Sequence, residues 1–182
     1  MKRRKFIQKS AMAAGSILIM QNLFAKSDAK IYGHGNMLYS LDTAWSQADA
    51  SKFPVNDCHE MVQDKHHRII LLTNETKNNI LIYTTRGKLL QSWGHEFPGA
   101  HGLTLHNENG EEFLYITDTE KHQVYKTNMN GKLLLTIDAP IGTGSYKKNT
   151  DFVPTETIID DNGDIFIADG YGSQYVLRYD SK

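Results

Sequence analysis

Beyond residue 58, apolar positions come in short runs that are rich in β-branched and aromatic side chains. Polar turns separate the runs, and three Asn-Gly pairs supply the positive φ angles that tight hairpins need. No helical period is sustained in this part of the chain. The pattern predicts an all-β fold of short antiparallel strands, the clearest being Arg68–Asn74, Asn79–Tyr83, Glu112–Asp118 and Asp164–Asp169.

The strand pattern repeats along the chain. The segment Gly87–Leu90 reads Gly-Lys-Leu-Leu, and the same four residues return 44 positions later at Gly131–Leu134. Asn74 and Asp118 are also 44 residues apart, whereas 51 residues separate Asp118 from Asp169 because a loop, 142–150, is inserted. A period of this length in short strands is typical of propeller blades. We therefore expect Asn74, Asp118 and Asp169 to be equivalent positions in three antiparallel four-stranded blades.

The repeats also place histidines near the expected channel. His59, His101 and Pro154 stand at the start of the first strand in the three repeats. The first strand of a blade lines the channel of a propeller, and the loops at its ends form a mouth where polar groups converge. His59 and His101 are thus expected on the same axial space. Beside Cys58, His59 is read either as a metal ligand or as a structural residue.

Charge is unevenly distributed over the 182 residues, whose net charge is -1. Five basic residues and no acidic ones fall in the first 25 positions, so the rest of the chain is acidic, and a generic nucleic-acid surface is excluded. The single cysteine, Cys58, excludes an intrachain disulfide.

The first 25 residues predict an export signal. A basic cluster that includes Arg3 and Arg4 precedes the apolar stretch Ala11–Ala25. The cluster resembles a twin-arginine signal, and the alternative is an ordinary secretory signal. Either predicts a periplasmic or secreted protein that leaves the membrane once the signal is cleaved; an uncleaved segment would be an anchor. We expect a signal at 1–25, a loosely packed arm at 26–57 with one strand at Met37–Leu41, and a partial propeller at 58–182.

Two blocks of residues stand out within the repeats. One is His101–Leu103 with Ile116–Asp118 and His122–Lys126, and the other is Phe152–Glu156 with Ala168–Tyr171. Over residues 59–182, the chain resembles the NHL-repeat propellers, and within them the six-bladed core of the peptidyl-α-hydroxyglycine α-amidating lyases.

The resemblance implies a metal site and an active site. It implies that His101 is a ligand of a catalytic zinc, that the carbonyl of Leu103 faces a structural calcium, and that Tyr171 deprotonates the substrate hydroxyl. The reaction would cleave a C–N bond of a small-molecule or peptide-end substrate. The arginine expected in the first repeat is replaced by Thr73–Glu75.

Closed propellers have at least four blades, and this chain holds about three repeats. We therefore expect an incomplete, open propeller that is inactive by itself, with the missing half as a possible partner. Whether the protein is an enzyme stays open, because a non-catalytic propeller that binds a protein ligand or serves as a scaffold is the alternative.

Other polar residues have simpler explanations. We expect His122 to contact a neighbouring blade, and His66 and His67 to be solvated in a hairpin turn. Residues 160–164 resemble a calcium loop but lack its glutamate at the twelfth position, so they predict a β-turn.

Overall fold

The computed structural model describes residues 30–181, and these fall into two units divided between Thr43 and Ala44. The predicted signal at 1–25 lies outside the described residues. Within residues 30–181, no helix is long and apolar enough to cross a bilayer.

The first unit contains a β-hairpin. Strand β1 (Ile31–His34) pairs antiparallel with β2 (Met37–Ser40), with Tyr32 opposite Tyr39. The sequence predicted one strand at Met37–Leu41 and missed β1. Every residue of both strands is exposed, so no burial pattern marks β1 in the sequence.

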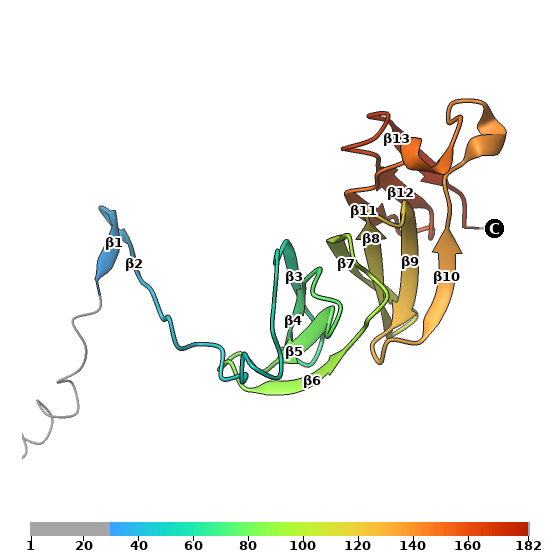
Figure 1. Ribbon diagram of the computed structural model, residues 1–182. Helices are drawn as coiled ribbons and strands as arrows, with labels where there is room; N and C mark the ends of the chain where they lie inside the picture. The colour runs from blue at the N-terminus through green and yellow to red at the C-terminus, as the bar shows by residue number, and fades with distance from the viewer. Residues whose placement is uncertain (1–29, 182) are drawn as a thin grey trace, which may run out of the picture. The chain divides into compact units, whose positions relative to one another are not determined.

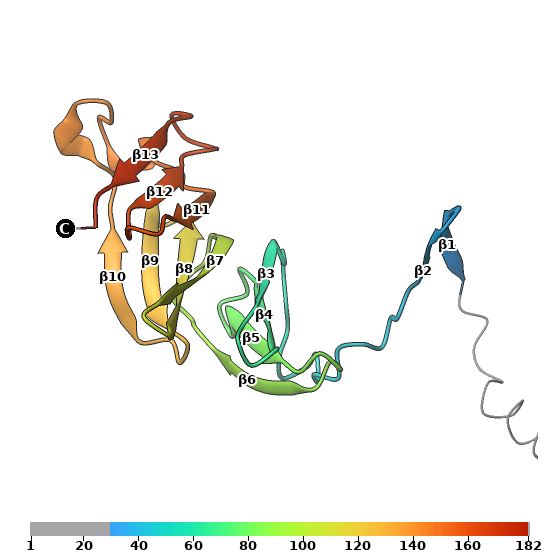
Figure 2. The same ribbon diagram turned by 180° about the vertical axis from the view of Figure 1, so that it is seen from behind.

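The second unit is nearly all-β: it has three antiparallel sheets (Figures 1 and 2) and two short 3₁₀ helices, Ile141–Thr143 and Asn149–Asp151. The first blade has the strand order β3-β4-β5-β6, and the second reads β7-β8-β9-β10 from its innermost strand outward. The third blade has three described strands in the order β11-β12-β13. The bounds are β3 (Glu60–Gln63), β4 (Ile69–Leu72), β5 (Ile80–Tyr83), β6 (Leu89–Trp93), β7 (Ala100–Glu108), β8 (Glu111–Asp118), β9 (Gln123–Asn128), β10 (Leu133–Ile137), β11 (Glu156–Ile159), β12 (Ile165–Ala168) and β13 (Val176–Tyr179).

The blades pack face to face through two apolar layers. One layer joins blades one and two and is centred on Ile70, Ile82, Leu114 and Ile116. The other joins blades two and three through Tyr115, Val124, Ile165 and Ile167, together with Tyr146 and Phe152. Because alternate residues of a strand face opposite sides, each blade presents one apolar face to each neighbour. Innermost strand β7 lies between β3 and β11.

Residues 44–57 cover the outer face of the first blade. The Trp45 ring lies 5.3 Å from the Tyr83 ring, and its Nε1–H donates to the carbonyl of Thr85 at 3.1 Å. The Asn78 amide donates to the carbonyl of Pro54 at 2.6 Å. Residues 44–57 therefore contact the first blade although most of them are exposed, and the predicted arm boundary at residue 57 stays a prediction. They add no strand, so strand periodicity does not reveal them.

The repeat equivalence is shifted by one residue in the first blade. The N–H of Thr73 donates to the carbonyl of Asn79, as Asp169 N–H does to Tyr175, and Asp118 pairs with Gln123. The position equivalent to Asp118 and Asp169 is therefore held by Thr73 and not by Asn74. The loop that follows is five residues long after Thr73 and four after Asp118, which explains why spacing alone misplaced it.

Candidate functional site at the channel mouth

His101 and Tyr171 meet at the mouth where β7 begins. His101 is the second residue of β7, and Tyr171 lies in the turn that follows β12. The His101 Nε2 is 3.2 Å from the Tyr171 hydroxyl, and the two rings meet edge to face with centroids 5.1 Å apart. The sequence predicted that these side chains share one mouth, and this placement is confirmed. Their chemical roles remain predictions.

Hydrogen bonding fixes the tautomer of a neutral His101. Its Nδ1 lies 3.0 Å from the carbonyl of Thr155. A carbonyl only accepts, so Nδ1 carries the proton and Nε2 keeps its lone pair. Nε2 then accepts from the Tyr171 O–H. The same arrangement prepares a histidine to bind a metal through Nε2.

His59 lies beside His101 but does not converge with it. The two rings are stacked with centroids 4.3 Å apart and an interplanar angle of 25°. The lone pair of a ring nitrogen lies in the plane of its ring. Because the two ring planes are stacked and nearly parallel, the lone pairs of the two rings are not directed at one common point. The pair thus shares the axial space as predicted, whereas joint binding of one ion would require one ring to turn.

A glycine lets the inner strands approach closely. A Cβ built on Gly102 would lie 2.5 Å from the carbonyl oxygen of Thr155 and 2.9 Å from the Thr117 hydroxyl. Gly102 N–H donates to that hydroxyl at 2.7 Å. Only a residue without a side chain fits between β8 and β11 here, and this close contact brings Thr155 to His101.

Two glutamates meet beside this glycine. Glu60 on β3 lies close enough to Glu156 on β11 for the two carboxyl groups to influence each other, and the backbone N–H of Leu103 is also near Glu60. Burial, followed by the neighbouring Glu156, raises the pKa of Glu60 to about 7. Glu156 accepts from the Thr104 hydroxyl at 3.0 Å. Sequence reasoning missed this pair, although both glutamates follow an equivalent strand-start residue, His59 or Thr155.

The described residues do not assemble a complete zinc site. No group of three or more His, Cys, Asp or Glu side chains among residues 30–181 is arranged to hold a metal ion. Catalytic zinc normally takes three protein ligands and a water. His101 fits such a role through Nε2 once this nitrogen gives up its hydrogen bond to Tyr171. Leu103 is buried in the layer between blades one and two, and its predicted contact with calcium stays a prediction.

The other singled-out residues have structural contacts. His122 Nδ1 lies 2.8 Å from the carbonyl of Phe152, so this histidine does bridge to the neighbouring blade. His66 and His67 lie in the hairpin between β3 and β4, and Cys58 is exposed.

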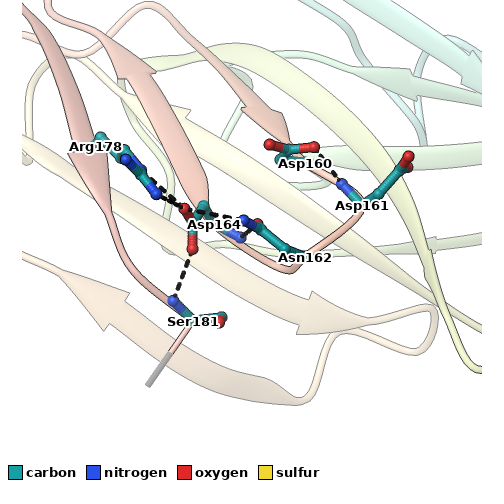
Figure 3. A network of polar contacts seen from close by, with 6 residues as sticks. All are labelled: Asp160, Asp161, Asn162, Asp164, Arg178 and Ser181. Atoms are coloured by element: carbon teal, nitrogen blue, oxygen red, sulfur yellow. Dashed lines mark hydrogen bonds and ion pairs between the residues drawn. The ribbon is translucent and has the colours of Figure 1, made fainter.

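Residues 160–164 form a turn, as predicted (Figure 3). The Asp164 carboxylate accepts hydrogen bonds from Nε of Arg178 at 2.8 Å and from the N–H of Ser181 at 3.1 Å. The hydrogen bond from Arg178 contributes most to lowering the pKa of Asp164. These contacts fasten the end of the described chain to blade three.

One groove in the described part of the chain lies away from the mouth. It encloses about 960 Å³ and is lined by the β7–β8 turn, by β10 and by the end of β13. His106 lines it, five residues further along β7 than His101. Neither His101 nor Tyr171 lines it, so its size does not bear on their chemistry.

Comparison with known proteins shows partial relatives of two kinds. Peptidyl-alpha-hydroxyglycine alpha-amidating lyase 1 of Drosophila melanogaster is 37% identical over 100 residues, which are 53% of this chain and 18% of the relative. A probable amidating lyase of Caenorhabditis elegans, pgal-1, is 31% identical over 114 residues, covering 62% of this chain and 31% of the relative. NHL repeat-containing protein 3 of Homo sapiens is 27% identical over 143 residues, covering 75% and 41%. No family model matches the chain.

The human relative is named for NHL repeats, which agrees with the repeated antiparallel sheets of the structure. The chain is a partial β-propeller of the NHL type. It spans less than half the length of the curated relatives it matches. In this NHL-type propeller, His101 and Tyr171 come from adjacent blades, so their contact depends on how the blades pack.

Proposed function

We propose that the chain contributes part of the active site of an exported lyase that cleaves peptidyl-α-hydroxyglycine to an amide and glyoxylate. The observation that carries the proposal is the His101–Tyr171 hydrogen bond across two blades at the channel mouth. Similarity to two amidating lyases, over roughly half of the chain, supports the same reaction class.

The two side chains suit the proton transfers of this reaction. Loss of the substrate hydroxyl proton lets its oxygen form the aldehyde C=O as the C–N bond breaks, and the amide nitrogen takes up a proton. Tyr171 is 68% exposed and can reach a substrate at the mouth. As Tyr171 accepts the substrate proton, its own proton can pass to Nε2 of His101 and return to the nitrogen. His101 is held for this exchange by the Thr155 carbonyl.

Zinc and calcium belong to the proposal, and no step above depends on either. Zinc, when bound, would polarise the substrate hydroxyl or carboxylate. His101 would supply one ligand through Nε2 in place of its bond to Tyr171, so zinc binding and proton exchange with Tyr171 are alternatives at this nitrogen. His59 would supply a second ligand only after its ring turns, and further ligands must come from outside the described residues. Leu103 is proposed to face calcium through its carbonyl. We therefore expect the 182-residue chain to bind zinc weakly and to show no turnover alone.

Location is a separate part of the proposal. Residues 1–25 are proposed to direct export, by the twin-arginine route, so that the protein acts in the periplasm or outside the cell. Replacing Arg3 and Arg4 by lysine should abolish export. Unchanged accumulation outside the cytoplasm would favour the general secretory route instead.

The test compares the 182-residue chain with a full six-bladed version of it, called the complete protein below. Zinc content and glyoxylate released from a benzoyl-α-hydroxyglycine substrate are measured for both. We expect turnover in the complete protein to fall about 10²-fold or more in Tyr171→Phe. An exposed tyrosine of the hairpin, Tyr39→Phe, is the matched control and should leave the rate unchanged. A zinc-loaded complete protein that releases no glyoxylate would overturn the proposal.

A second candidate function is a binding module without catalysis. It is favoured by the absence of a three-ligand metal group among residues 30–181 and by the exposure of Tyr171. Such a mouth would bind a protein ligand or a peptide end. Retention of peptide binding in Tyr171→Phe without any turnover in either protein would support this alternative.

A further inference from the structure

We propose that Tyr146, in the loop inserted between blades two and three, is a positioning residue that sets the place of Tyr171 through the carboxylate of Asp169. The inference deepens the proposed function, because it concerns the same mouth. Its geometric part can be tested whether or not the protein is a lyase.

Tyr146 anchors the inserted loop in the core. Its side chain is 1% exposed, and its hydroxyl donates to Oδ2 of Asp169 at 2.9 Å. Its ring meets those of Phe152 and Tyr175 edge to face, with centroids 5.8 Å and 5.7 Å away. Phe152 is next to Val153, whose carbonyl accepts from the N–H of Tyr171, and Tyr175 directly follows the turn that holds Tyr171. The Tyr146 ring therefore contacts a residue from each of these two segments.

Asp169 binds the two segments that flank Tyr171. Its Oδ1 accepts from the N–H of Val153 at 2.7 Å, and its Oδ2 accepts from the N–H of Ser173 at 2.7 Å. Asp169 is fully buried, so losing one of these bonds would leave a polar atom without water to replace it. The orientation of this carboxylate therefore decides where the turn lies relative to β11.

The turn itself has little room to move by other means. A Cβ on Gly172 would collide with Oδ1 of Asp169 and with the carbonyl of Asp151, so the backbone lies against both. The Ser173 hydroxyl donates to that same carbonyl at 3.1 Å. A shift of Asp169 is thus passed directly to Gly172 and to its neighbour Tyr171.

The equivalent carboxylate in the second blade lacks a tyrosine among its bonded partners. Asp118 accepts from the N–H groups of Gly99, Glu120 and Lys121. In the third blade, the Tyr146 hydroxyl of the inserted loop is an additional donor to the Asp169 carboxylate. Burial and the bond to Asp169 raise the pKa of Tyr146, which keeps its hydroxyl protonated as a donor. The insertion that lengthens the third repeat thus supplies a contact that the regular repeat does not have.

The test removes the Tyr146 hydroxyl and observes His101. Tyr146→Phe keeps the ring contacts, and Tyr171→Phe defines the complete loss of the hydrogen bond to His101. In ¹⁵N-histidine-labelled protein, Nε2 of His101 should move in Tyr146→Phe at least half of the way to its Tyr171→Phe position. In a protein with lyase turnover, kcat should fall about 3- to 10-fold, with KM unchanged.

The matched control is Tyr115→Phe. Tyr115 is also buried and donates to a carboxylate, Glu108, at 3.1 Å, but this contact lies towards the far end of β7. A similar loss of thermal stability with no shift at His101 is expected. An equal His101 shift in this control would mean that general loosening explains the effect, and that result would overturn the proposal.

A second variant covers the case in which Tyr146→Phe does not fold. Asp169→Asn keeps the shape of the side chain and weakens the acceptors that face Tyr146 and the turn. It should shift His101 Nε2 in the same direction. An unchanged His101 signal in a folded Tyr146→Phe or Asp169→Asn protein would overturn the proposal. Absence of turnover in the wild-type complete protein would instead overturn only the proposed function.

Discussion

At the scale of single residues, Gly102 determines how closely the inner strands pack. Its missing side chain allows β7 to lie against Thr155 of the third blade, and the Thr155 carbonyl then fixes His101. The same residue lies beside the Thr117 hydroxyl, which its N–H needs as an acceptor. A single methyl group here would have to displace backbone atoms.

We predict that Gly102→Ala destabilises the chain by about 1–3 kcal/mol, the usual cost of overpacking. The new Cβ would lie 2.5 Å from a backbone oxygen, which cannot turn aside as a flexible side chain could. Urea unfolding followed by circular dichroism measures the change. Gly142→Ala is the control, because a Cβ there meets nothing within 4 Å, and it should be nearly neutral. Equal effects of the two substitutions would contradict the prediction.

The sequence could indicate His101 and Tyr171 because both lie in short motifs within the repeats. It could not indicate Tyr146, because this residue belongs to the inserted loop, which has no counterpart in the other blades. Burial of a tyrosine against an aspartate 23 residues away depends on tertiary packing. The stacked geometry of His59 was equally hidden, since strand equivalence gives proximity but not ring orientation.

At the scale of elements, two glutamates link the three innermost strands. Glu60 on β3 lies near the N–H of Leu103 on β7 and near the carboxyl group of Glu156 on β11. Two adjacent carboxyl groups attract each other only while one of them carries a proton. The contact between the inner strands is therefore sensitive to pH.

We predict that this contact weakens as the pH rises from about 4.5 to about 7. Burial and Glu156 raise the pKa of Glu60 to about 7, above its ordinary value of 4.5. The folded state then holds a proton that the unfolded state releases, so stability decreases with pH across this window and the contribution is lost above it. The difference in urea midpoint between wild type and Glu60→Gln should change over the window. A constant difference from pH 4.5 to pH 8 would contradict the prediction.

The blades themselves were predictable because a strand period and a residue spacing agreed. The Gly87 and Gly131 turns mark the same step in blades one and two, and the structure places both after the third strand of a blade. Loop length was not predictable from that spacing. The extra residue after Thr73 moved the equivalent position in blade one by one residue. In blade three, the residue whose carbonyl contacts His101 is Thr155 and not Pro154.

At the scale of the whole molecule, the chain covers one end of its own blade stack. Leu81 and Tyr83 of β5 are buried and lie on the same side of the strand, two residues apart. Neither belongs to the two layers between blades, whereas the Trp45 ring and the Ser46 hydroxyl both approach Tyr83. Residues 44–57 thus complete the first blade and form one unit with it.

This covering predicts a sharp difference between two truncations. A chain of residues 44–182 should unfold at nearly the same temperature as one of residues 26–182, because residues before Ala44 belong to the other unit. A chain of residues 58–182 should lose on the order of 2 kcal/mol for each large apolar side chain that it uncovers. It should also aggregate, because an apolar blade face becomes exposed.

Trp45→Ala in the 44–182 chain should reproduce part of the loss of stability. Leu41→Ala in the 26–182 chain is the control and should not, because Leu41 is already 65% exposed. Scanning calorimetry and size-exclusion chromatography measure both effects. A 58–182 chain that is monomeric and as stable as the 44–182 chain would show that blade one needs no cover.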